Sequence, residues 1–318
     1  MIKKNNVPLS DISWLSTLPS EGMVDSFFEP ETSEELISLC SSFYKEGLDF
    51  DLIGHTSNTL YIHDYRCERM VSTRKLKKFV IGEDVIKCQC GTSVRQLALA
   101  AINAGICGFE GLIDLPGTVA SAIYGHATCY NCDISSLLIN ATVLTDDGNL
   151  LVVTPEWFYF KQRSSILKRN EKKAVIVSVV LKRINGDSVE LKSIADNNHA
   201  TRQSTQPEAK NSLGSIFCEE GRPSVLNRFL GLITLFYGAL LRLTNHKQEV
   251  IAEKRNHLKF VLLGAKDVEP YVRRWNWYQW RDENSHKLFW KYVHLHNKLF
   301  TKSEFEIEIK QNRRAISK

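Results

Sequence analysis

Residues 115–134 read LPGTVASAIYGHATCYNCDI, and this stretch does more than any other to decide the fold. A Pro-Gly turn is followed by a run of small side chains and then by a His-Ala-Thr segment. Consecutive small residues fill a core poorly, because protein interiors are closely packed. They suit a place where the backbone approaches something flat, large and hydrogen-bonding, such as a cofactor ring or a pyrophosphate. A tight loop before an Ala-rich helix is the alternative.

The overall composition is that of an ordinary soluble globular protein. Its 318 residues favour two or three domains. The net charge of +5 is compatible with an anionic small-molecule ligand but too diffuse for a nucleic-acid surface. We therefore expect a small-molecule partner and no nucleic acid.

The sequence predicts neither an export signal nor a membrane span. Residues 1–14 contain no apolar segment typical of a secretory signal. The longest apolar run, 229–241, lies between Arg228 and Arg242, and thirteen residues are too few to cross a bilayer. We predict that this run forms a buried helix, with an interfacial helix as the alternative.

Eight cysteines without an export signal indicate reduced thiols in a cytoplasm. Cys88 and Cys90 form a CxC pair, and Cys129 and Cys132 form a CxxC pair, which together could imitate a zinc site. The first pair, however, lies in an alternating strand pattern over 85–90, where two cysteines share a face by chance. We therefore expect no metal.

The first half of the chain alternates helical and strand patterns. Apolar residues recur with helical spacing over 31–44, with Thr32 or Ser33 as the N-cap, and over 94–104, before Gly105. Strand patterns occupy 50–53, 59–63, 79–91, 140–145, 150–153 and 174–182. Mixed in this order, the elements predict an α+β fold.

The chain changes character after residue 185. Residues 185–211 are polar and poor in apolar side chains, which predicts a linker or a mobile loop. Helical patterns over 226–261, an aromatic-rich stretch over 275–290 and a strand pattern over 305–310 follow. Four of the six tryptophans lie in the aromatic stretch, so we expect a separately built C-terminal domain.

One turn between two strand patterns could bind phosphate. It consists of Gly54, His55, Thr56, Ser57 and Asn58. Glycine and small hydroxyl residues in such a turn can present backbone N–H groups to an anion, although an ordinary polar turn is the alternative. Because no helix follows the turn, a Rossmann site is disfavoured.

Three positions are candidates for the chemistry itself. Arg163 could stabilise an anionic intermediate, with solvated surface charge as the alternative. Ser215 follows a glycine on a turn into a strand and could be a positioned proton donor. Glu306 and Glu308 alternate on one face of the last strand pattern, where exposure at a sheet edge is the alternative.

In their order and spacing, these motifs resemble the UDP-N-acetylenolpyruvoylglucosamine reductases, the MurB family of flavoenzymes. The family's Gly-Gly-Gly-Ser-Asn turn is similar to 54–58. Its Ile-Pro-Gly-Thr-Val-Gly-Gly-Ala and Asn-Ala-Gly-Ala-Tyr-Gly segments are similar to 115–122 and 126–131. Its arginine, serine and glutamate motifs resemble 156–168, 206–217 and 305–309. The resemblance is near-complete from residue 28 to 217 and patchy afterwards.

The resemblance implies an α+β architecture in which a two-lobed FAD-binding domain, of the PCMH-like or vanillyl-alcohol-oxidase-like flavin fold, precedes a C-terminal α+β substrate-binding domain. The lobes would be residues 1–80 and 81–190, and the divergent, helix-rich substrate domain would be 191–318, with 185–211 as the linker. FAD would contact the turn Gly54–Asn58 and a second group of residues. That group comprises Leu115, Pro116, Gly117, Thr118, Ala120, Ser121 and His126.

The resemblance also implies a reaction. NADPH would reduce FAD, and UDP-N-acetylglucosamine enolpyruvate would become UDP-N-acetylmuramate for peptidoglycan, in the cytoplasm and on a monomeric enzyme. Hydride would reach C3 of the enolpyruvyl group, so that negative charge builds toward C2 and the carboxylate. Arg163 would neutralise this enolate, Glu308 would polarise it and Ser215 would deliver a proton to C2.

The chain departs from the family pattern in ways that keep two alternatives open. Two glycines become Ala120 and Ser121, and an asparagine becomes His126, which adds atoms where backbone would meet the flavin. Acidic Glu219 and Glu220 stand where the family has a basic segment. The alternatives are a related flavin oxidoreductase acting on another nucleotide sugar or polyol, and a flavin-binding or flavin-free protein with a structural or regulatory role.

Overall fold

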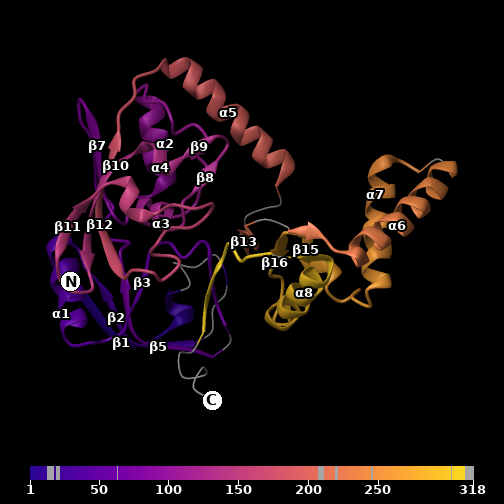
Figure 1. Cartoon of the computed structure of the whole chain (residues 1–318), viewed down its shortest axis with the longest axis horizontal. Coiled ribbons are helices and arrows are strands. Elements are labelled where there is room, and N and C mark those ends of the chain that lie inside the picture. The colour runs from indigo at the N-terminus through magenta and orange to yellow at the C-terminus, as the bar shows by residue number, and fades with distance from the viewer. Residues whose placement is uncertain are drawn as a thin grey trace. The chain divides into compact units, whose positions relative to one another are not determined.

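The computed structural model separates into two compact units (Figure 1). The large unit comprises Met1–Gln206 and the end of the chain from Lys310, and the small unit comprises Pro207–Ile309. The structure describes residues 1–12, 18, 22–62, 64–206, 211–218, 221–244, 246–301 and 303–311. Glu219 and Glu220 lie outside the described residues.

The first sheet of the large unit has the strand order β1-β2-β5-β3. Its strands are β1 (Ile2–Pro8), β2 (Gly22–Glu29), β3 (Asp51–Ile53) and β5 (Tyr65–Ser72). Strand β1 is antiparallel to β2, whereas β2 and β3 are both parallel to β5. Helix α1 (Ser33–Lys45) begins after the predicted cap Thr32, whose hydroxyl accepts a hydrogen bond from the Glu35 amide at 3.2 Å. The helix predicted for this region is confirmed.

The second sheet of the large unit is antiparallel throughout and has the order β11-β10-β12-β7-β6. Its strands are β6 (Phe79–Ile81), β7 (Val85–Gln89), β10 (Leu138–Thr145), β11 (Leu150–Val153) and β12 (Ala174–Lys182). Their apolar side chains form one core with α2 (Val94–Asn103) and α3 (Val119–Tyr124). Each strand predicted for this sheet is therefore confirmed.

Short elements complete the large unit. They are η1 (Leu9–Ile12), β4 (Thr59–Tyr61), β8 (Thr128–Cys129), β9 (Cys132–Asp133), α4 (Ile134–Leu137) and η2 (Pro155–Phe158). Strand β4 follows β3 after the Gly54–Asn58 turn, as predicted.

The linker predicted for 185–211 is wrong over most of its length, because Ser188–Thr205 form an 18-residue helix, α5. The Asp187 carboxylate caps its N-terminus by accepting hydrogen bonds from two backbone amides. Only Leu191 and Ala195 are buried, so the apolar stripe is narrow and the composition resembles that of a linker. Polar contacts hold the outer part, where the His199 imidazole lies 2.7 Å from the Asp114 carboxylate.

The small unit is built on a three-stranded antiparallel sheet of order β13-β16-β15. Its elements are β13 (Ser212–Ser215), β14 (Arg222–Pro223), α6 (Val225–Leu243), α7 (Gln248–Leu262), η3 (Glu269–Tyr271), β15 (Val272–Arg274), β16 (Trp277–Gln279), α8 (Ser285–Leu299) and β17 (Phe300–Thr301). The last strand, β18 (Glu308–Lys310), begins in the small unit and ends at Lys310 of the large unit. Aromatic rings fill the interior of the small unit, where Tyr278 packs edge-to-face with Trp280 and Phe289 and at a tilt against Tyr292. The predicted aromatic-rich stretch is thus the core of this unit.

Helix α6 contradicts the predicted burial of residues 229–241. Phe229 is 59% exposed and Phe236 is 72% exposed. By length and composition α6 could cross a membrane, yet only 28% of its most apolar window is buried inside the protein. Hydrophobicity alone could not show that the small unit covers this helix on one side only.

Candidate active site

The turn Gly54–Asn58 and the segment from Leu115 to Ser121 lie against each other in the large unit. A Cβ atom added at Gly54 would lie 2.9 Å from the Oγ1 atom of Thr118. A Cβ atom added at Gly117 would lie 3.5 Å from the Oγ atom of Ser57. The structure therefore brings together two segments that the sequence singled out separately. We call the pair the glycine cradle.

The second half of the glycine cradle is fixed by hydrogen bonds within the chain. Gly117 has φ of +116°, a conformation open to glycine and strained for other residues. The buried Thr118 caps α3 by accepting a hydrogen bond from the Ser121 amide at 3.2 Å. The Thr118 amide in turn donates to the Ser121 hydroxyl at 2.9 Å. Ser121, one of the departures from the family pattern, thus forms a capping box with Thr118 at the N-terminus of α3.

The other departure in this helix, Ala120, also packs without conflict. Its amide donates to the Cys90 carbonyl at 3.2 Å, and its methyl group packs on the cores of both sheets. Neither substituted side chain forces the cradle apart.

The first half of the glycine cradle is a tight turn with a neutral histidine in it. Thr56 is buried, has φ of +51°, and its carbonyl accepts a hydrogen bond from the Thr59 amide at 3.3 Å. Burial, and secondly the positive charge of Arg74, lower the pKa of His55. At neutral pH this side chain is therefore an uncharged donor and acceptor.

The residues of the cradle fit FAD. At Gly54 a methyl group would press on the Thr118 side chain of the opposite segment, and at Gly117 it would come into van der Waals contact with Ser57, so the two segments lie close together. Small hydroxyl side chains surround the contact, namely Thr56, Ser57, Thr118 and Ser121. Backbone amides and hydroxyls are the groups that bind a pyrophosphate without a bulky side chain intervening.

His126 uses both ring nitrogens within the protein. Its Nδ1 atom lies 2.6 Å from the Lys161 carbonyl oxygen, and its Nε2 atom lies 3.1 Å from a carboxylate oxygen of Asp133. The Nε2 atom also lies 3.2 Å from the Ser135 hydroxyl. The ring also stacks on Phe160, with centroids 4.7 Å apart. That His126 contacts the cofactor stays a prediction.

Asp133 and Ser135, which the sequence reasoning missed, complete this cluster. The Ser135 hydroxyl donates to Asp133 at 2.7 Å. Burial raises the pKa of Asp133, but hydrogen bonds from Ser135 and the charge of His126 outweigh it and leave the pKa below its usual value. The signal in the sequence was an aspartate two residues before a serine, the pattern of a helix N-cap.

The contact of His126 with the Lys161 carbonyl holds the turn that contains Arg163. Lys161 and Ser164 exchange two backbone hydrogen bonds, of 2.9 and 3.0 Å, and Arg163 lies between them with φ of +54°. The Arg163 carbonyl accepts a hydrogen bond from the Lys168 ammonium at 3.1 Å. His126 therefore holds one end of the turn and Lys168 holds its middle.

Ser215 and Glu308, the other two predicted catalytic residues, belong to neighbouring segments of the small unit. Ser215 ends β13 and pairs with Trp277. The next carbonyl, that of Ile216, accepts a hydrogen bond from the Glu306 amide at 2.9 Å. Glu306 and Glu308 are both half-buried, and of the two only Glu308 lies in a strand, the short β18. The catalytic roles of Ser215 and Glu308 stay predictions. Arg163 belongs to the large unit.

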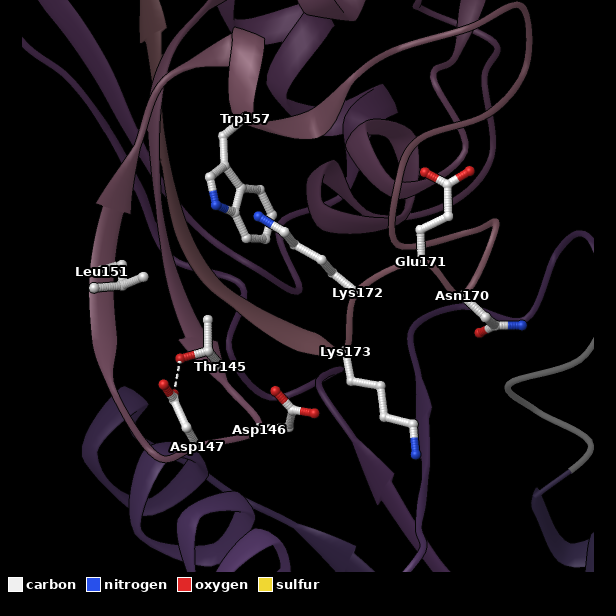
Figure 2. Close-up of a pocket in the computed structure, with 9 residues that line it drawn as sticks. All are labelled: Thr145, Asp146, Asp147, Leu151, Trp157, Asn170, Glu171, Lys172 and Lys173. Carbon is white, nitrogen blue, oxygen red and sulfur yellow. Dashed lines mark hydrogen bonds between the residues drawn. The ribbon is translucent and has the colours of Figure 1, made fainter.

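A separate hollow of about 390 Å³ lies beside the turn between β10 and β11. Figure 2 shows its lining residues, which are Thr145, Asp146, Asp147, Leu151, Trp157, Asn170, Glu171, Lys172 and Lys173. The Lys172 ammonium lies 4.8 Å from the centre of the Trp157 ring. None of the predicted site residues lines this hollow. In the part of the chain that the structure describes, no three His, Cys, Asp or Glu side chains gather as a metal site would require.

Part of the chain is similar to known flavin-binding proteins. Residues 24–154 match the family model described as an FAD binding domain. A UDP-N-acetylenolpyruvoylglucosamine reductase of Lactobacillus delbrueckii subsp. bulgaricus is 28% identical over 215 residues, which cover 67% of this chain and 70% of the relative. The protein of the same name from Fervidobacterium nodosum is 28% identical over 62% of this chain and 63% of its own. These similarities agree with the resemblance to divergent MurB reductases that the sequence motifs indicate.

A solved MurB structure shares the fold. The crystal structure of the Thermus caldophilus enzyme matches 98% of this chain and 100% of its own, with a TM-score of 0.65 and 19% identity. The predicted α+β flavin fold is therefore confirmed, and FAD is the cofactor that the matched domain implies. The glycine cradle lies within the matched residues 24–154, as does His126.

Proposed function

We propose that the chain is an FAD-dependent oxidoreductase that uses NADPH to reduce UDP-N-acetylglucosamine enolpyruvate to UDP-N-acetylmuramate in peptidoglycan precursor synthesis. One observation carries the proposal: the two segments of the family's flavin signature, far apart in the sequence, meet at Gly54 and Gly117. The names of the curated relatives support the substrate. We place the reaction in the cytoplasm, on a monomer.

The residues of this chain have distinct tasks in that reaction. FAD, when bound, supplies hydride transfer between the nicotinamide and the substrate carbon. The guanidinium of Arg163 neutralises the enolate, because its charge is permanent and its planar fork matches a carboxylate. The Ser215 hydroxyl delivers the proton to C2, and the Glu308 carboxyl polarises the same intermediate.

The bracing of Arg163 supports its task. A cation stabilises developing charge best when it is held in place before the reaction, so that no reorganisation is required. The turn that carries Arg163 is held by the His126–Lys161 contact at 2.6 Å and by the Lys168 ammonium. These contacts fix the backbone from which the guanidinium projects.

Two measurements on the purified protein test the proposal. The first is the absorption spectrum, in which we expect a flavin band at about one FAD per chain. The second is NADPH oxidation, which we expect to depend on UDP-N-acetylglucosamine enolpyruvate. A protein without flavin would refute the cofactor assignment. A flavin whose NADPH oxidation does not respond to the enolpyruvyl nucleotide would refute the substrate.

The role of Ser215 is tested separately. We expect Ser215→Ala to lower kcat by at least 100-fold, because a positioned proton donor contributes about 10² to 10⁴ in rate. Ser204→Ala, which removes an exposed hydroxyl on α5, is the matched control and should leave kcat unchanged. Unchanged turnover in Ser215→Ala would show that another group protonates C2.

A related flavin oxidoreductase that acts on another nucleotide sugar or polyol is the second candidate. It is favoured by the incomplete match to the Lactobacillus relative, which covers 67% of this chain. This candidate would be favoured if NADPH reduces the flavin and a different sugar nucleotide then reoxidises the reduced flavin.

A further inference from the structure

The outer face of α6 is apolar along its whole length. Six of its side chains are more than half exposed, namely Val225, Phe229, Leu232, Leu235, Phe236 and Leu243. Monomeric soluble proteins rarely expose a contiguous apolar patch of this kind unless something binds to it.

The inner face of α6 carries few large apolar side chains. Its buried positions are Leu230, Thr234 and Gly238, and a Cβ atom at Gly238 would lie only 2.6 Å from the Arg255 side chain of α7. The Asn227 amide oxygen accepts a hydrogen bond from the Lys259 ammonium, also on α7, at 2.6 Å. Figure 1 shows the two helices side by side in the small unit. A surface helix ordinarily turns its apolar face inward, and α6 does the reverse.

The charges on α6 are all positive. The helix contains no Asp or Glu, and Arg228 and Arg242 stand near its two ends. At 1.5 Å per residue the two arginines are separated by about 21 Å along the helix axis. Lys247 follows shortly after the helix. An apolar face with cations at both ends complements the acyl boundary and the anionic headgroups of a bilayer.

Although the whole helix is long and apolar enough to cross a membrane, its two arginines and its packing against α7 oppose a span. The apolar run between the arginines is about 20 Å long, whereas the hydrocarbon core of a bilayer is about 30 Å thick. Spanning would also draw the charged side chains of α7, which pack on α6, into hydrocarbon. A helix in the plane of the interface keeps them in water.

We propose that α6 is a membrane-surface anchor whose outer face inserts at the headgroup–acyl boundary of an anionic bilayer. A second copy of the chain fits this face less well. Antiparallel pairing of two α6 helices would bring Arg228 toward Arg242, and parallel pairing would bring each arginine toward itself. No acidic side chain on α6 could neutralise either contact. The proposal is independent of the reaction proposed above.

Flotation of the full-length protein with lipid vesicles tests the proposal. With vesicles of phosphatidylcholine and phosphatidylglycerol we expect the protein to co-float, and with phosphatidylcholine alone or at high salt we expect much weaker binding. The variant Phe229→Ser/Phe236→Ser should bind the anionic vesicles at least about tenfold more weakly, because it removes inserted apolar area.

A matched variant controls for a general loss of apolar surface. Val80→Ser/Val152→Ser changes two exposed apolar residues of the large unit and should bind vesicles like the unaltered protein. Both double variants leave buried residues untouched, and an unchanged circular dichroism melting curve verifies that they fold.

Three results would overturn the proposal. The first is a failure of the unaltered protein to co-float with anionic vesicles. The second is binding of these vesicles by the Phe229→Ser/Phe236→Ser variant that is as strong as binding by the unaltered protein. The third is a dimer, revealed by light scattering, that this variant converts to a monomer, which would show that a second copy covers α6.

Discussion

The large unit and the small unit differ in the room around two of their glycines. At Gly54 of the large unit, an added Cβ atom would lie 2.9 Å from the Oγ1 atom of Thr118 in another segment. At Gly231 on helix α6 of the small unit, it would meet no heavy atom within 4 Å. Gly54 thus lies where two segments of the glycine cradle close on each other, whereas Gly231 lies on a helix that exposes much of its apolar surface.

The largest expected effect tests whether one reaction uses both units. We expect Arg163→Ala in the large unit to lower kcat by about 10² to 10³, because it removes the cation that stabilises the enolate. The FAD content should not change. Kinetics of NADPH oxidation with the enolpyruvyl nucleotide measure the effect, and Arg95→Ala, an exposed arginine on α2, is the control. A kcat of Arg163→Ala equal to that of the control would remove Arg163 from the mechanism.

A pair of glycine substitutions tests the difference in fit directly. Gly54→Ala should destabilise the protein by about 1–3 kcal/mol and lower its flavin content, since Thr118 cannot move without losing its cap on α3. Gly231→Ala lies in helix α6 with open space around it and should stabilise by about 0.5–1 kcal/mol. Thermal unfolding and flavin absorbance measure both. Equal effects at the two sites would contradict the comparison.

A buried histidine predicts a pH dependence that belongs to the small unit. His296 is stacked 3.8 Å from Phe217, and among the described residues neither of its ring nitrogens has a hydrogen-bond partner. Burial lowers its pKa to about 4. The folded protein therefore disfavours the proton that the unfolded chain accepts near pH 6.5, so stability falls as the pH decreases from about 6.5 to 4, by about 3 kcal/mol.

The control for this prediction is His296→Phe, which fits the aromatic stack but does not titrate. We expect it to flatten the dependence of the unfolding free energy on pH in that window. Chemical unfolding at a series of pH values measures the effect. An unchanged pH dependence in this variant would assign the proton uptake to another group.

The smallest expected effect concerns the contact of His126 with the turn that contains Arg163. His126→Ala should lower kcat about tenfold while FAD content and KM change little, because it loosens the Lys161–Ser164 turn without removing the guanidinium. His199→Ala, which breaks another His–Asp pair of the large unit, is the matched control. If His126→Ala instead abolished flavin binding, the residue would contact the cofactor, as the family pattern implied.

The sequence predicted the second sheet and helices α1 and α2 of the large unit, because local patterns and burial agree there, but it missed strands β1, β2 and β5 of the first sheet. The caps at Thr32 and Ser93 precede helices whose apolar residues face a core, and the strands of the second sheet alternate as expected. The close approach of Gly54 to Thr118 was within reach only through the family resemblance, since no local pattern relates two segments so far apart in the chain.

Helices α5 and α6 show why the rest could not be predicted. Helix α5 buries only Leu191 and Ala195, so its composition resembles a linker although Asp187 caps a regular helix. Helix α6 has the composition of a core helix, yet most of it is exposed. Composition measures how apolar a segment is, but whether a face is covered depends on elements elsewhere in the chain. The bracing of Arg163 by His126 depends on such distant partners as well.

The return of the chain to the large unit at Lys310 fixes the end of the small unit. The Lys310 carbonyl accepts a hydrogen bond from the Ile62 amide at 3.1 Å, and its ammonium pairs with Asp51 at 3.4 Å. A unit that begins and ends at the large unit can be rebuilt over evolutionary time without disturbing the strands to which the chain returns. This topology gives a physical reason why the large unit keeps the flavin signature while the small unit carries an uncovered helix.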